Sequence, residues 1–259
     1  MPDERQRRRS IYLLPNAFTT ANLFSGFYAV VQAMNQHFEV AAIAIFLAMV
    51  FDSMDGRVAR LTNTQSAFGE QYDSLADMIS FGMAPALVMY EWSLQGLGRW
   101  GWLAAFVYVV GAALRLARFN ANIGKVDKQY FQGLPSPAAA ALVAGFVWLS
   151  VDNKLSLSDG LIPWAAFALT IYAGVAMVSN APFFSGKSFA LGRSVPFWVM
   201  LLVVAVFVFV SSDPPVVLFV LFVLYSLSGW LVWLWRVRRA RRLGLRMRGA
   251  ESDDPPSHE

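Results

Sequence analysis

The chain has 259 residues, of which 57% are hydrophobic and 15% are charged, and its formal net charge is +4. This balance excludes an intrinsically disordered chain and is unusual for a soluble domain. Because the sequence has no cysteine and two widely separated histidines, it also excludes disulfides, thiol catalysis and a typical zinc site.

The hydrophobic residues gather in blocks long enough to cross the hydrocarbon core of a bilayer, which takes roughly 20 helical residues. Continuous apolar runs without strict alternation favour helices over a transmembrane barrel. We therefore predict an all-α, polytopic membrane bundle of about eight helices. In chain order, the predicted helices are 18–35, 38–60, 70–92, 100–120, 135–151, 161–178, 195–211 and 215–236.

The basic residues predict the orientation of this bundle. With the N-terminus placed in the cytoplasm, every Lys and Arg except Arg99 and Lys154 falls in a cytoplasmic segment, as the positive-inside rule requires. Both termini are therefore expected in the cytoplasm, in a protein of the bacterial inner membrane. Terminal arginines are more typical of contact with anionic membrane lipids than with nucleic acid, so no nucleic-acid partner is predicted.

Three regions are expected along the chain. Residues 1–17 form a basic N-terminal segment, residues 18–237 form the membrane domain, and residues 238–259 form a tail that is basic and then disordered. The end of the tail is polar and contains proline, which is typical of disordered segments.

Acidic residues interrupt the second and third predicted helices. At about 100° per residue, Asp52 and Asp55 lie roughly 60° apart on one helix face. Gly56 and Ala59 fall on the same side, and Arg60 lies at its margin. This face therefore combines two carboxylates with small residues that allow close approach.

On the next helix, Gly69, Asp73 and Asp77 recur at intervals of four residues and share one face. Because the two helices are adjacent and antiparallel, their acidic faces can meet near the cytoplasmic end. The four carboxylates would repel one another in low dielectric, and Arg57 and Arg60 offset only part of that charge. Oxygen ligands without His or Cys favour Mg²⁺ or Mn²⁺. The alternative is that the acids cap helices or pair with the two arginines at a wet interface.

The stretch DSMDGRVAR at 52–60, followed by Gly69, Asp73 and Asp77, matches every fixed position of the CDP-alcohol phosphotransferase signature, and the chain resembles that family. The resemblance implies a membrane enzyme that moves a phosphatidyl or related group from a CDP-linked donor to an alcohol and releases CMP. It also implies a homodimer.

The resemblance further implies a role for each signature residue. Two divalent cations, Mg²⁺ or Mn²⁺, would be bound by Asp52, Asp55, Asp73 and Asp77. Asp77 would also act as the general base. Gly56, Ala59 and Gly69 would leave room for the cytidine end of the donor, and Arg60 would contact a donor phosphate.

Segments outside the signature indicate the acceptor. The stretches PNAFTTANLFSG, YDSLADMISFGMAPA, LRLARFN, FQGLPSPAAAA and VSNAPFFSGKSF are similar to those of phosphatidylserine synthases. This likeness implies CDP-diacylglycerol as donor and L-serine as acceptor. Arg115 and Arg118, near the cytoplasmic end of the fourth predicted helix, are candidates for substrate binding. Anchoring of that helix at the lipid interface explains them equally well.

Two other functions are compatible with the residues. The signature does not name the alcohol, so the same chemistry could use glycerol phosphate or inositol phosphate as acceptor. Acids inside a membrane bundle could instead form the cation site of a transporter, which would move ions without turning over a CDP-lipid.

Overall fold

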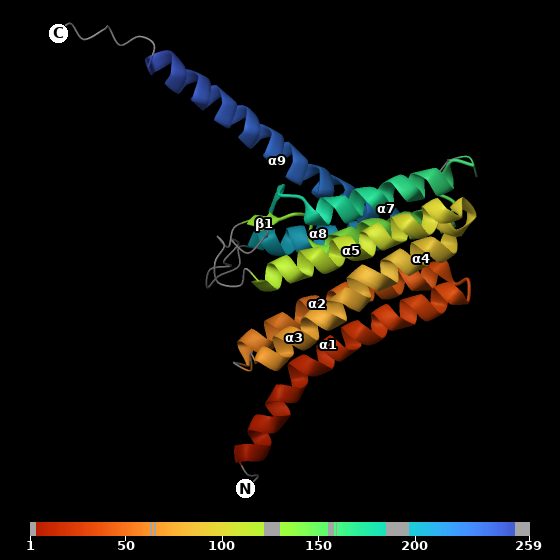
Figure 1. Cartoon of the computed structure of the whole chain (residues 1–259). Helices are drawn as coiled ribbons and strands as arrows, with labels where there is room; N and C mark the ends of the chain where they lie inside the picture. The colour runs from red at the N-terminus through yellow and green to blue at the C-terminus, as the bar shows by residue number, and fades with distance from the viewer. Residues whose placement is uncertain are drawn as a thin grey trace, which may run out of the picture.

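The computed structural model describes residues 4–62, 64, 66–121, 130–154, 158, 160–184 and 197–251. In these ranges the protein is a helical bundle with one short pair of strands (Figure 1). The helical elements are α1 (Glu4–Met34), α2 (Phe38–Leu61), α3 (Ala67–Asp77), η1 (Met78–Met83), α4 (Ala84–Trp92), η2 (Leu94–Leu97), α5 (Arg99–Ala121), α6 (Ser136–Val151), α7 (Ile162–Val178), α8 (Phe197–Ser212) and α9 (Pro214–Glu251). The strands are β1 (Tyr130–Gln132) and β2 (Pro182–Phe184). The predicted all-α class is confirmed.

Each predicted helix coincides with a helical segment, and the boundaries differ most at the two ends of the chain. α1 begins at Glu4 rather than at 18, and α9 continues to Glu251 rather than ending at 236. The prediction was wrong here because it confined each helix to its apolar run, whereas arginine and leucine are good helix formers and extend a helix beyond that run. Figure 1 shows the end of α9 projecting away from the bundle. The tail predicted to be disordered, beyond Glu251, lies outside the described residues.

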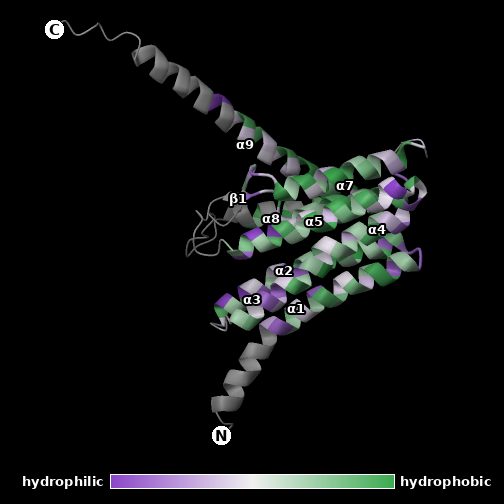
Figure 2. Ribbon diagram, viewed as in Figure 1, coloured by the Kyte–Doolittle hydropathy of each residue, from purple (hydrophilic) through white to green (hydrophobic). Residues whose placement is uncertain are grey.

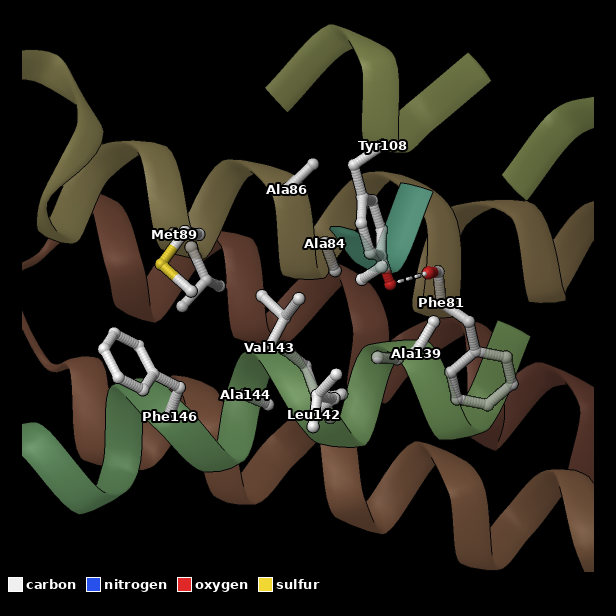
Figure 3. Packing of buried hydrophobic residues seen from close by; sticks show 14 of the residues in the cluster. Phe81, Ala84, Ala86, Met89, Tyr108, Ala139, Leu142, Val143, Ala144 and Phe146 are labelled. Atoms are coloured by element: carbon white, nitrogen blue, oxygen red, sulfur yellow. Dashed lines mark hydrogen bonds between the residues drawn. The ribbon is translucent and has the colours of Figure 1, made fainter. Parts of the chain in front are cut away.

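The third predicted helix consists of α3, η1 and α4 in direct succession, and η1 is a π-helical turn that begins immediately after Asp77. Tyr108 of α5 donates a hydrogen bond from its hydroxyl to the carbonyl oxygen of Phe81, at 2.9 Å (Figure 3). On the other side, the Ser80 hydroxyl donates to the carbonyl oxygen of Asn22 in α1, at 3.0 Å. α1 can approach this closely because Gly26 has no Cβ, which would lie 2.6 Å from the Cα of Ser80. The turn is therefore fixed between α1 and α5.

The strands β1 and β2 were not predicted, because both segments were assigned to turns. They pair antiparallel and join the α5–α6 connection to the α7–α8 connection, with Phe131 opposite Phe183. Gly133 follows β1 with φ at 82°, a conformation that favours glycine, and its N–H donates to the carbonyl of Ala181. Phe183 is buried and packs against Gly229, so the strand pair is attached to α9.

The apolar core lies between the helices and is rich in alanine. Figure 3 shows Ala84 and Met89 of α4 packed with Leu142 and Val143 of α6. Gly111 of α5 lies so close to the backbone of Gly174 in α7 that a Cβ would strike it, and small residues allow such close helix packing in transmembrane bundles. Figure 2 shows hydrophobic residues along most of the bundle and hydrophilic residues gathered where α2 meets α3.

Two described helical stretches, Arg99–Ala121 and Pro214–Trp235, are long and apolar enough to cross a membrane. Ser136–Val151 and Ile162–Val178 are shorter apolar helices. Figure 1 shows α1 and α9 leaving the bundle at the same end. Eight membrane crossings and two cytoplasmic termini stay predictions.

One exposed group of charges joins two connections of the bundle. Lys154, between α6 and α7, lies 2.7 Å from Oδ2 of Asp152 and 2.6 Å from Oδ1 of Asp213, which precedes α9. Hydrogen bonds to Asp152 and Asp213 hold the pKa of the Lys154 ammonium above its ordinary value. These are the ion pairs that the described part of the chain contains.

Candidate active site

α2 and α3 bring three of the four predicted acids together. One carboxylate oxygen each from Asp52, Asp55 and Asp73 lies within 4.8 Å of the other two. Asp55 is buried, and the other two are half-buried. The two acidic helix faces therefore meet, as the spacing of the residues along α2 and α3 predicted.

The fourth predicted acid, Asp77, lies beside the group of Asp52, Asp55 and Asp73 and is not one of its three members. Its charge interacts with those of Asp52 and Asp73. Asn22 of α1 donates a hydrogen bond from Nδ2 to Oδ1 of Asp77, at 3.2 Å. One oxygen of the predicted general base is therefore held by α1.

α1 also supplies a second polar contact that the sequence analysis missed. Thr19 donates from its hydroxyl to Oδ2 of Asp55, at 3.0 Å, and both residues are buried. Thr19 and Asn22 are three residues apart, which places them on the same helix face. The signal in the sequence was the run of polar residues inside an apolar helix, because such residues are costly in a membrane and usually face the bundle interior.

The three-acid group has the chemistry of a site for a hard divalent cation. All its ligands are oxygens, and Oδ1 of Asp73 is buried without a hydrogen-bond partner. An unpaired buried carboxylate oxygen is costly, and a cation would satisfy it. Within the described ranges, neither Arg57 nor Arg60 forms an ion pair with these acids. The residues present thus fit a metal site better than they fit the alternative of arginine pairing.

A cavity of about 200 Å³ adjoins the acids. Its lining includes the four residues predicted to accommodate the donor, which are Gly56, Ala59, Arg60 and Gly69. Two of the acids, Asp55 and Asp73, also line it, together with Asn16 and Thr19 of α1. A Cβ built on Gly56 would meet Nη1 of Arg60 at 3.7 Å, so it would occupy the cavity without striking the described protein atoms.

The two candidate arginines of α5 point in different directions. Arg115 donates from Nη1 to the hydroxyl of Ser136, at 2.6 Å, and its charge interacts with those of Asp77 and Asp52. Arg118 donates from Nη1 to Oδ1 of Asn180, at 3.2 Å, after the end of α7. The structure therefore brings Arg115 to the acids and directs Arg118 to a neighbouring loop.

α9 also contributes to this region, although the sequence analysis expected little from the last two helices. Tyr225 interacts electrostatically with Arg115. Its ring packs against that of Phe183 in β2, with 5.9 Å between the centroids. The unpredicted strand pair and α9 thus reach the same site as α5.

An acidic group that could hold a divalent cation, next to a cavity bordered by small residues and an arginine, is the arrangement expected of an enzyme that handles phosphate esters. Residues 12–172 match the family model described as CDP-alcohol phosphatidyltransferase, and the chain belongs to that family. The matched region runs from α1 into α7 and contains the four acids and both α5 arginines.

Three curated relatives carry the same name. The CDP-diacylglycerol–serine O-phosphatidyltransferase of Helicobacter pylori (strain ATCC 700392 / 26695) is 38% identical over 201 residues, which cover 78% of this chain and 81% of the relative. The protein of that name from Saccharomyces cerevisiae is 40% identical over 144 residues, with 50% and 51% covered. The protein of that name from Methanocaldococcus jannaschii is 35% identical over 158 residues, with 60% and 72% covered.

Proposed function

We propose that this enzyme transfers the phosphatidyl group of CDP-diacylglycerol to the hydroxyl of L-serine and releases CMP, as a step in phospholipid synthesis. The observation that carries the proposal is the 38% identity to the Helicobacter pylori serine O-phosphatidyltransferase over 78% of the chain. The assembly of the signature acids at one place supports it.

The donor is proposed to bind in the cavity beside Asp55 and Asp73. Gly56, Ala59 and Gly69 leave space there, which suits the cytidine end of the donor. Arg60 lines the same cavity and forms no ion pair with a described carboxylate, so its charge is available to a donor phosphate.

Asp52, Asp55 and Asp73 are proposed to hold divalent cations, Mg²⁺ or Mn²⁺ and two per site, with Asp77 as a further ligand. When bound, such cations neutralise the diphosphate and stabilise the charge of the departing phosphate. Thr19 holds Oδ2 of Asp55 and thereby orients that carboxylate toward the group.

Asp77 is proposed to accept the proton of the serine hydroxyl. The serine oxygen then forms a bond to the phosphorus that carries diacylglycerol, the bond from that phosphorus to the CMP oxygen breaks, and the proton stays on Asp77. Asn22 holds Oδ1 of Asp77 and thereby fixes the orientation of this carboxylate. Arg115 and Arg118 are proposed to bind substrate, Arg115 at the acids and Arg118 nearer the surface.

The setting of the reaction is also a proposal. Residues 18–237 would form a membrane domain of eight helices, with both termini and the active site on the cytoplasmic side of a bacterial inner membrane, and the enzyme would act as a homodimer among membrane lipids. This arrangement lets serine and CMP exchange with the cytosol while the acyl chains stay in the bilayer.

An acceptor panel tests the function directly. Purified enzyme would receive CDP-diacylglycerol with L-serine, glycerol 3-phosphate or inositol phosphate, with and without Mg²⁺ or Mn²⁺, and CMP release would be measured. We expect metal-dependent release with serine. Release with another acceptor alone would replace serine in the proposal, and ion flux through liposomes without turnover of the lipid would favour a transporter.

A further inference from the structure

We propose that Glu70, in the first turn of α3, recognises the cytosine base of the donor by accepting a hydrogen bond from its exocyclic amine. The inference rests on the proposed function, because it assigns a residue to the nucleoside end of the donor cavity. Gly56, Ala59 and Gly69 leave room for a nucleoside, but their side chains offer no hydrogen-bonding group that could distinguish one base from another. A residue outside the fixed positions of the signature would therefore select cytidine over uridine.

Glu70 shares one cavity with the residues proposed to hold the donor. It lines the space of about 200 Å³ that Asp73, Arg60 and Gly69 also line. It lies three residues before Asp73 on α3, which is about 4.5 Å along the helix axis. Glu70 is exposed, whereas Asp73 is half-buried. The cavity therefore has the acids at its inner end and Glu70 at its mouth, where the base of a donor lies when its diphosphate is at the acids.

The carboxylate of Glu70 is open to a ligand. Within the described ranges it forms neither an ion pair nor a side-chain hydrogen bond, although Arg60 lines the same cavity. An ionised carboxylate accepts hydrogen bonds and donates none. In a cavity that receives a diphosphate, such a group repels the ligand unless a hydrogen-bond donor of that ligand meets it. The amine of cytosine is a donor of this kind.

The two pyrimidine bases differ at the position that a carboxylate can recognise. Cytosine carries an amine at its fourth ring position, and glutamate and aspartate accept from this amine in base recognition. Uracil carries a carbonyl oxygen at the same position, and two acceptors that face each other repel. Glu70 would therefore attract a cytidine donor and oppose a uridine donor, so that both effects contribute to selectivity.

Asn16 of α1 supplies a second polar side chain to this cavity. Its Oδ1 lies 3.7 Å from the position that a Cβ on Gly69 would take, so the amide borders the space beside that glycine. An amide has both an acceptor and a donor, and by rotating it can match the edge of either base. Asn16 can thus bind the base without selecting cytosine, which leaves the selection to Glu70.

Two other roles are open to a glutamate at this position. A carboxylate can bind a ribose hydroxyl, as it does in dinucleotide-binding folds. An acid in the first turn of a helix also stabilises the helix N-terminus. The place of Glu70 at the mouth favours the base, because the ribose lies between the base and the diphosphate. The experiment separates all three roles.

The test measures inhibition of serine transfer by CMP, UMP and dCMP, and transfer from the CDP, UDP and dCDP forms of the lipid donor. We expect the unaltered enzyme to bind CMP more tightly than UMP. Glu70→Gln should reduce this preference about tenfold or more, because an amide can donate to the uracil oxygen as well as accept from the cytosine amine. The preference for CMP over dCMP, which differ only in the ribose, should stay unchanged. The preference among the three lipid donors in kcat/KM should follow the same pattern.

A matched control comes from another helix start. Glu39→Gln alters an exposed glutamate in the first turn of α2, at the end of that helix away from the acids, and should leave every preference unchanged. Asn16→Ala should weaken the binding of CMP and UMP by the same factor. CMP with two methyl groups on its exocyclic amine, which then has no N–H, tests the contact in the unaltered enzyme, and we expect it to bind about tenfold more weakly than CMP. Thermal unfolding in detergent measures any loss of stability in Glu70→Gln.

Each outcome decides the proposal. An unchanged preference for CMP over UMP in Glu70→Gln overturns it, and so does equal binding of the two nucleotides by the unaltered enzyme. A change in the preference for CMP over dCMP alone would assign Glu70 to the ribose, and a lower unfolding temperature alone would limit it to the start of α3. These results leave the proposed function intact if the unaltered enzyme releases CMP with serine. If that enzyme does not use CDP-diacylglycerol, the proposed function fails, and the inference fails with it.

Discussion

The carboxylates of this site differ in what surrounds each oxygen. Thr19 binds Asp55 and Asn22 binds Asp77, but Oδ1 of Asp73 is buried and unpaired. A native protein tolerates such an oxygen where a ligand satisfies it during function. Asp73 is therefore the acid whose replacement best separates metal binding from folding.

The Asp73→Asn variant should lose about 100-fold or more of its transfer activity. Its metal-free form should unfold at no lower a temperature than the unaltered protein, because one of several mutually repelling charges is removed. Thermal unfolding in detergent, with and without Mn²⁺, measures both effects. We expect Mn²⁺ to raise the midpoint of the unaltered protein and of the exposed control Glu39→Gln, and to leave that of Asp73→Asn nearly unchanged. A full Mn²⁺ response in Asp73→Asn would contradict the assignment.

Gly56, which lines the cavity, and Gly26, which packs against Ser80, lack a side chain for different reasons. A Cβ on Gly56 would enter the cavity, whereas a Cβ on Gly26 would collide with Ser80. We expect Gly56→Ala to raise the KM for CDP-diacylglycerol about tenfold without lowering stability, because it fills space meant for the ligand. Gly26→Ala should instead lower the unfolding temperature. Steady-state kinetics beside thermal unfolding distinguishes the two, and equal losses of stability would count against a ligand cavity at Gly56.

At the scale of elements, the hydrophobic blocks and the spacing of the acids were sufficient to predict the helices and the meeting of α2 with α3. The π-helical turn η1 could not be predicted, because contacts with α1 and α5 hold it in place. The strands β1 and β2 were missed because three-residue strands carry too little alternation to detect.

The candidate site shows the same division between local pattern and tertiary contact. The signature residues share faces that helix periodicity reveals. Arg115 and Arg118 could not be distinguished from the sequence, because both lie near one helix end and only the packing of α5 shows which faces the acids. Ser136 comes from α6 and gave no local signal of its contact with Arg115.

The position of η1 directly after Asp77 gives Tyr108 a testable function. Tyr108→Phe removes the buried hydrogen bond to the Phe81 carbonyl, which costs about 0.5–1.5 kcal/mol of stability. Because the turn then loses its hydrogen bond to α5 and keeps the one that links it to α1, we expect kcat to fall while the KM for serine stays nearly constant. Tyr90→Phe, on α4, is the control. An unaltered kcat in a destabilised Tyr108→Phe protein would limit Tyr108 to a structural role.

At the scale of the whole molecule, the family match ends at residue 172, yet the site extends beyond it. β2 and α9 follow the matched region, and through Phe183 and Tyr225 they reach Arg115. α9 also packs along α6, which begins at Ser136. The apolar half of α9 therefore packs on elements that border the site, while its arginine-rich end projects away from the bundle (Figure 1).

A pair of changes in α9 separates these two halves. Gly229→Leu forces a side chain into the ring of Phe183, and we expect it to lower both the unfolding temperature and serine transfer, because overpacking displaces β2. Deletion of residues 238–259 removes the projecting end and should leave transfer in detergent nearly unchanged. Kinetics with both substrates measures the contrast. If the deletion abolished serine transfer while Gly229→Leu did not, the arginine-rich end rather than the packed half of α9 would serve the site.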